Sequence, residues 1–127
     1  MGNPITDNIK IGTLGELLIQ IRFLEHDIQA APPIKDSGND LIAIKGESCR
    51  FIQVKTTTKT DYRINKSQLP DCYHILAIVK LKPLEYKVLL DESEIYLIPR
   101  EKIENISPSE YNNYILSDTL INELFSN

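Results

Sequence analysis

NDLIAI at residues 39–44 and FIQVKT at residues 51–56 are the two stretches that decide the fold. Both are rich in apolar residues with β-branched or aromatic side chains, so each predicts a β-strand. Side chains two residues apart on a strand point to the same face. Gln53 and Lys55 therefore share one face, and Ile52 and Val54 take the other. A Gln-x-Lys pair within an apolar strand indicates a place for an anionic group, such as a phosphate held by a metal at Asp40.

The segment before these strands predicts a long helix. Thr6 or Asp7 can cap it, and it runs to about Glu25. Gly12 and Gly15 weaken this helix unless close packing or a ligand needs the space. Two stripes at helical spacing predict that the helix is covered on both sides. The stripes comprise Leu14, Leu17, Leu18, Ile21 and Leu24, and Gly12, Glu16, Ile19 and Phe23.

The remaining segments predict one mixed sheet. A short extended run at 28–31 is followed by a turn at 35–39, and a tight turn at 45–48 predicts a hairpin. A polar loop or short helix follows at 58–68, and the most apolar strand, expected to be central, at 73–81. Further strands are expected at 86–90 and 95–98, a short helix at 99–103, and a last helix at 119–125 capped by Ser117-Asp118. The fold class is therefore α/β (α+β), with an N-terminal helix and a central mixed sheet.

Composition narrows the class of protein. The 127 residues are expected to form one domain, 1–127, with enough core to fold alone. No window approaches the roughly 18 apolar residues of a membrane span, and the first ten residues lack the apolar core of a signal peptide. These features predict a cytoplasmic, intracellular protein with no membrane partner. Cys49 and Cys72 have no metal-ligand spacing and suit reduced thiols, although a disulfide stays open.

The charge balance is acidic. The formal net charge is -4 and the pI is about 5.2. A general nucleic-acid coat would be basic, so this balance argues against one. A nuclease with an acidic metal pocket is still compatible, because its carboxylates offset its basic groove.

Four residues form a candidate site for phosphodiester hydrolysis. This reaction needs an activated water and relief of the charge on the phosphate, and a divalent metal on carboxylate oxygens supplies both. Mg²⁺ favours one or two carboxylates together with waters and substrate oxygens. Asp40 suits a metal ligand, and the Gln53 carbonyl could complete the coordination sphere. Lys55 is placed for the water or the phosphate, and Glu16 could add a second carboxylate from the helix.

These motifs resemble the PD-(D/E)xK nuclease superfamily, and more closely its small members with a Gln-x-Lys variant. Those members include some homing and restriction endonucleases and Holliday-junction-resolvase-like proteins. The resemblance covers roughly residues 10 to 100. It rests on GE at 15–16, SGNDLI at 37–42, IQVKT at 52–56 and IYLIP at 95–99.

The resemblance implies a restriction-endonuclease-like fold with the order α-β-β-β-(α)-β-β. It also implies a deoxyribonuclease dependent on Mg²⁺ or Mn²⁺. Asp40 corresponds to the metal-binding acid, and Glu16 to the helix acid. Gln53 takes the position usually held by Asp or Glu, and Lys55 that of the catalytic lysine. The implied metal ligands are Asp40, Gln53 and Glu16.

DNA is the partner that this assignment predicts. Lys59, Arg63 and Lys66 follow the Gln-x-Lys strand and could track the DNA backbone, with Lys35 as a further candidate. A solvated connector explains these basic residues equally well. A domain this short has little room for a separate sequence-reading domain, so a homodimer or higher homo-oligomer is expected. A dimer would place two sites on opposite strands.

Other interpretations stay open. The chain could be a catalytically inactive member of the same fold that binds nucleic acid or protein, or a small interaction protein in which Gln53 and Lys55 are structural. Asp40 alone could be a turn acid, and Lys55 an edge-strand lysine with its charge in solvent. Glu16 could pair with Arg22 or Lys10, and backbone groups could satisfy Gln53. His26 and His74 lack metal-ligand spacing and are interpreted as structural.

Overall fold

A computed structural model describes residues 6–35 and 38–126. The order is α1 (Asp7–Glu25), β1 (Gln29–Ala31), β2 (Leu41–Lys45), β3 (Ser48–Thr57), η1 (Lys66–Gln68), β4 (Ile75–Leu84) and β5 (Lys87–Pro99). The short helices η2 (Arg100–Lys102) and η3 (Pro108–Tyr114) and the helix α2 (Asp118–Leu124) complete the chain. This order confirms the expected fold class. Part of the predicted turn at 35–39 lies outside the described residues.

The five strands form one mixed sheet in the order β1-β2-β3-β4-β5. Only β3 and β4 run parallel, joined by the connector at 58–74; the other neighbours are antiparallel. Gly46, with a φ of 60°, forms the tight turn between β2 and β3, as the hairpin prediction required. The strand expected to be central, β4, lies between β3 and β5, and the middle strand is β3.

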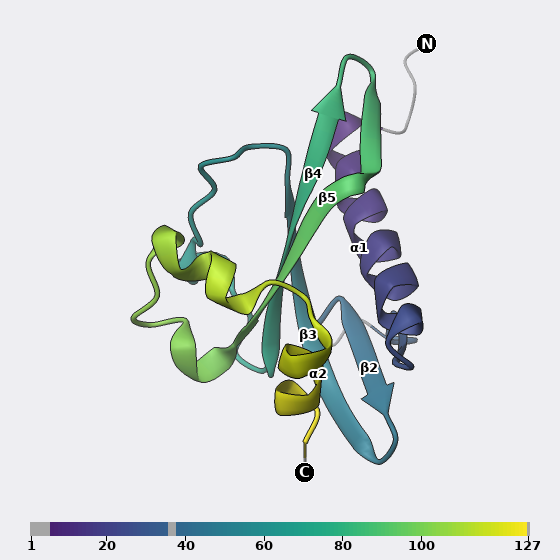
Figure 1. The fold of residues 1–127 in the computed structure, drawn as a ribbon, viewed down its shortest axis with the longest axis vertical. Helices are drawn as coiled ribbons and strands as arrows, with labels where there is room; N and C mark the ends of the chain where they lie inside the picture. Colours follow the sequence, from purple (N-terminus) through teal and green to yellow (C-terminus); the bar gives the residue numbers. More distant parts are fainter. Residues whose placement is uncertain (1–5, 36–37, 127) are drawn as a thin grey trace.

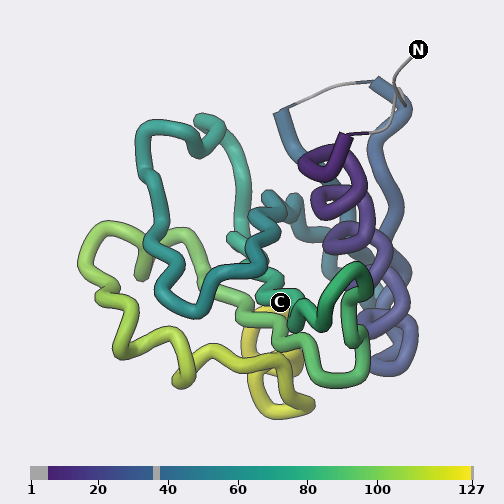
Figure 2. Tube along the Cα trace, turned by 90° about the horizontal axis from the view of Figure 1, so that it is seen from above, coloured from purple at the N-terminus to yellow at the C-terminus, as the bar shows by residue number. Residues whose placement is uncertain are grey.

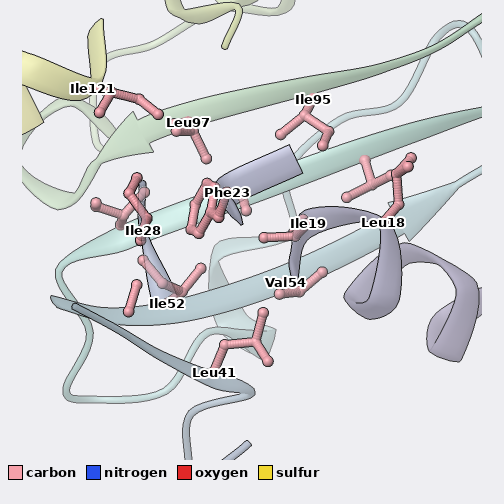
Figure 3. Close-up of a cluster of buried hydrophobic side chains, with 14 of the residues drawn as sticks. Leu18, Ile19, Phe23, Ile28, Leu41, Ile52, Val54, Ile95, Leu97 and Ile121 are labelled. Carbon is pink, nitrogen blue, oxygen red and sulfur yellow. The ribbon is translucent and has the colours of Figure 1, made fainter. Parts of the chain in front are cut away.

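Each face of the sheet carries its own apolar cluster. On one face α1 packs against the sheet, and Figure 3 shows Leu18, Ile19 and Phe23 beside Ile52 and Val54 of β3. The opposite face is covered by the connector and by the segment containing η2 and η3 (Figures 1 and 2). Its cluster comprises Tyr73, Leu76, Ile78, Tyr96, Ile98, Ile103 and Tyr111. The period of two along β4 and β5 distributes their side chains between the two faces.

The prediction that α1 is covered on both sides is wrong. Leu17, Ile21 and Leu24 are 49%, 52% and 64% exposed. The buried side is a single stripe of Gly15, Leu18, Ile19 and Phe23. The chain has one sheet to cover the helix, so only the stripe facing the sheet loses its contact with water.

The two strands predicted at 86–90 and 95–98 are one strand, β5. Its polar middle contains no Gly or Pro that would break it, and a register shift opposite Lys80 and Lys82 accommodates the irregularity. Ser93 stabilises this point, because its Oγ accepts from Lys82 N at 3.0 Å and donates to Leu89 O at 3.0 Å. The last helix begins as predicted, with Ser117 as its N-cap.

Candidate active site

The candidate site lies at the start of β2, where β3 continues beyond its pairing with β2. The last β2–β3 pair is Leu41 with Ile52, so within the described residues 53–57 have a strand neighbour only in β4. Asp40 lies at this free edge of β3. Its backbone N–H donates to Ile52 O at 3.1 Å, and its Oδ2 accepts from Val54 N–H at 2.8 Å. The carboxylate therefore takes the place of a partner strand and is fixed beside the Gln-x-Lys segment.

Gln53 and Lys55 lie on the face opposite α1. Their neighbours Ile52 and Val54 enter the core beneath α1, and the register pairs Gln53 with Leu76 and Lys55 with Ile78. Gln53 is only 9% exposed. Its Oε1 is buried and has no hydrogen-bond donor in the part of the chain that the structure describes. The expectation that backbone groups satisfy this amide is therefore wrong for its oxygen.

Glu16 approaches the site because α1 comes unusually close to β3. A Cβ at Gly15 would overlap the side chain of Thr56, the residue after Lys55. Burial, and to a smaller extent the Asp40 carboxylate, raise the pKa of Glu16 above its ordinary value of 4.5. Arg22 is engaged elsewhere, with Glu25 at 2.9 Å and Asp91 at 4.0 Å. The close packing at Gly15 thus brings a second carboxylate near Asp40.

The donors at this edge fit a small divalent cation. Within residues 6–35 and 38–126, no three His, Cys, Asp or Glu side chains gather into a metal-binding group. A site here would instead use two carboxylates and an amide oxygen. Mg²⁺ is commonly bound by one or two carboxylates with waters filling the other positions, and it accepts amide oxygens. The unpartnered Gln53 Oε1 is the observation that favours this fit, because buried acceptors are rarely left unsatisfied.

The predicted DNA-contacting residues have different environments. Lys35, Lys59 and Arg63 have exposed side chains. Lys66 instead contacts the turn that follows η2. Its Nζ donates to Glu104 O at 2.8 Å and lies 3.9 Å from the Glu104 carboxylate. Only two connector residues, Lys59 and Arg63, therefore keep a cationic group free of such a contact among the described residues.

Lys80 is a residue near the site that the sequence interpretation did not identify. It lies on β4 two residues after Ile78, the partner of Lys55, and so on the same face. Its Nζ donates to Thr60 O at 3.2 Å and lies 5.2 Å from the Tyr96 ring centroid. The signal in the sequence was a lysine directly after the continuous apolar run at 75–79. Lys80 fixes the start of the connector above this face.

His74 supports the middle of β3. Phe51 N–H donates to its Nδ1 at 2.8 Å, which places the ring proton on Nε2 when the imidazole is neutral. Burial, with Arg50 and Arg100, lowers the pKa of His74. The ring borders a cleft of about 670 Å³ that also contains Lys66 and Glu104. Because that cleft carries charges of both signs, it does not by itself indicate an anionic ligand.

Comparisons with known proteins place the fold. No family model and no curated protein sequence matches the chain. Among solved structures, the chain is similar to the bacterial homing endonuclease I-Ssp6803I, with a TM-score of 0.66 and 15% sequence identity. The match covers 99% of this chain and 96% of that chain. At this identity the similarity establishes a shared fold. The described residues contain no helix that is both long and apolar enough to cross a membrane.

Proposed function

We propose that residues 1–127 form one nuclease domain of the PD-(D/E)xK superfamily, in its small Gln-x-Lys variant, that hydrolyses DNA phosphodiester bonds with Mg²⁺ or Mn²⁺. One observation carries this proposal: the Asp40 carboxylate accepts a hydrogen bond from the backbone N–H of Val54, the residue between Gln53 and Lys55. The fold shared with a homing endonuclease supports it.

Each residue has a distinct role in the proposed reaction. Asp40 and Glu16 supply carboxylate oxygens to the cation, and Gln53 supplies its unpartnered Oε1. The bound cation would polarise the phosphate and make an attacking water more acidic. Lys55 lies on the face of Gln53, and its Nζ donates to a phosphate oxygen or orients the water. Lys59, Arg63 and Lys35 contact the DNA backbone.

The test is cleavage of supercoiled DNA with Mg²⁺ or Mn²⁺, and with EDTA. Asp40→Asn keeps an oxygen for the Val54 N–H but removes the charge, so cutting should fall to background. Lys55→Ala should lose about 100-fold or more. Asp27→Asn and Lys82→Ala change exposed residues away from the site and serve as matched controls. Equal cutting by wild type, Asp40→Asn and Lys55→Ala would contradict the assignment.

A second candidate function is a catalytically inactive member of this fold that binds DNA or protein. Gln53 favours it, because an amide in place of a carboxylate lowers the attraction for a divalent cation. The two functions separate in one experiment. DNA binding that is unaffected by EDTA, with no cutting in Mg²⁺ or Mn²⁺, would identify the inactive module.

We also propose that the protein acts as a homodimer, with the exposed stripe of α1 (Leu17, Ile21 and Leu24) against the same stripe of a second copy. A two-fold contact of this kind buries the same stripe on both copies. Such a dimer would provide two sites for the two strands of a duplex.

Sedimentation velocity tests the dimer. Leu17→Glu and Ile21→Glu together should give a monomer, because charge would be buried at the interface. Leu84→Glu changes a similarly exposed leucine outside α1 and should leave the dimer intact. A monomeric wild-type protein at all concentrations would contradict the proposal.

A further inference from the structure

Two buried amide oxygens at the candidate site lack hydrogen-bond donors. They are Asn39 Oδ1 and Gln53 Oε1, and they are the unsatisfied buried side-chain atoms found in the described residues. Asn39 is 7% exposed and Gln53 9% exposed. Burying an acceptor without a partner destabilises a protein, so such atoms usually have a ligand, ion or water that the protein alone does not provide.

Both oxygens belong to the same short stretch of structure. Asn39 directly precedes Asp40 in the chain. Gln53 lies between Ile52 and Val54, the two residues that are hydrogen-bonded to Asp40 through their backbones. The common position of the two amide oxygens indicates one missing partner.

The chemistry of the set defines this partner. Asn39 Oδ1, Gln53 Oε1 and the Asp40 carboxylate all carry negative partial or full charge and all accept. A cation satisfies such a set, and hard divalent cations bind amide and carboxylate oxygens together. An anion or an apolar group would leave both amide oxygens unsatisfied. Both oxygens are buried, so bulk solvent does not reach them.

We propose that Asn39 is a ligand of the divalent cation, binding it through Oδ1 alongside Asp40, Glu16 and Gln53. This inference rests on the proposed function for the cation itself. It adds an oxygen that neither the Gln-x-Lys motif nor the spacing of the acids indicated. Two neutral amide oxygens explain how the site holds a cation with only two carboxylates.

An amide at position 39 has a further consequence. A carboxylate there would bind the cation more strongly, but it would repel Asp40 and Glu16 when the cation is absent. Asn39→Asp should therefore tighten Mn²⁺ binding and lower the thermal stability of the cation-free protein. A residue that merely fills space beside Asp40 would not change these two quantities in opposite directions.

The experiment is Mn²⁺ titration calorimetry on the full chain, with thermal unfolding in the presence and absence of Mn²⁺. Even partners outside the coordination sphere change metal affinity by about 10–100-fold, so Asn39→Ala should weaken Mn²⁺ binding about tenfold or more. Ser48→Ala is the control. It removes a buried polar group at the far end of β3, so it should change stability without changing the affinity.

Two comparisons decide the outcome. If Asp40→Asn weakens Mn²⁺ binding and Asn39→Ala does not, the role of Asn39 is wrong and the proposed cation site stands. If wild type and Asp40→Asn bind Mn²⁺ equally, or neither binds it, the cation site fails and this inference fails with it. Should Asn39→Ala not fold, Asn39→Asp decides, because its shape is unchanged. Unaltered or weaker Mn²⁺ binding by that variant overturns the proposal.

Discussion

The two ends of β3 treat their polar groups in opposite ways. At the first end, Ser48 Oγ donates to Phe125 O, and Arg50 donates to Leu124 O at 2.9 Å and to Ser126 O at 2.6 Å. In the half of β3 towards Thr57, Gln53 Oε1 has no hydrogen-bond donor among the described residues. The first end anchors the C-terminal segment through satisfied hydrogen bonds. The second end keeps acceptors and charges available, as expected of a site that binds something.

One substitution at each end of β3 gives the strongest test of this contrast, because Lys55→Ala should affect activity and Arg50→Ala stability. Lys55→Ala should reduce DNA cleavage by about 100-fold or more with little loss of stability. Arg50→Ala should cost about 2–3 kcal/mol of unfolding free energy, because it leaves C-terminal carbonyls without a charged donor, and should leave cleavage unchanged. Denaturant unfolding and cleavage assays on both variants provide the measurements. Loss of activity in folded Arg50→Ala would remove the distinction between the two ends.

The approach of α1 to the open end depends on one of its two glycines. Gly15→Ala would overlap Thr56, so it should destabilise the protein by about 1–3 kcal/mol and displace Glu16. Among the described residues, no atom lies within 4 Å of a Cβ at Gly12, so Gly12→Ala should stabilise the helix by up to about 1 kcal/mol. Chemical unfolding measures both effects. Equal changes for the two glycines would mean that the close contact is unimportant.

Adding a negative charge at position 53 tests directly whether this end of β3 binds a cation. Gln53→Glu replaces an amide oxygen by a carboxylate, which should tighten Mn²⁺ binding about tenfold, equivalent to about 1.4 kcal/mol. Titration calorimetry measures the affinity. Weaker or unchanged binding would show that residue 53 does not face the cation.

The middle of β3 should respond to pH. Because the pKa of His74 is lowered in the folded protein, its contribution to stability is complete above the ordinary value of 6.5. This contribution is lost as the pH falls through the lowered pKa. His74→Asn keeps an acceptor for Phe51 N–H without titrating, so it should lose less stability than wild type on acidification. Parallel pH dependences of unfolding for the two proteins would contradict this role of His74 in the pH dependence of stability.

The smallest expected effect concerns the connector after the open end. Neutralising a residue that contacts phosphate reduces the slope of log affinity against log salt by about 0.9. Lys59→Ala with Arg63→Ala should flatten the slope by roughly twice this amount. Lys66→Ala should change it little, because Lys66 is bound to Glu104. An unchanged slope in the double variant would identify the connector as a solvated loop.

The sequence by itself determined the local elements and their faces. The alternation along 51–56 correctly placed Ile52 and Val54 in the core and Gln53 and Lys55 opposite them, because the period of a strand is a property of the backbone. Capping residues located both helices, since a cap acts within one turn. The choice of Asp40, Gln53, Lys55 and Glu16 also came from the sequence, and their roles stay a proposal.

Only the tertiary structure decided which distant groups meet. Whether α1 is covered on one side or two depends on how many other elements pack against it. The apolar pattern of the helix does not specify that number. The close contact between Gly15 of α1 and Thr56 of β3 brings Glu16 towards Asp40, which precedes β2. Lys66 donates to Glu104 O, a residue distant from it in the sequence. The missing donors of Asn39 and Gln53 become visible only when every neighbour is in place, because satisfaction of a buried oxygen is a property of its surroundings.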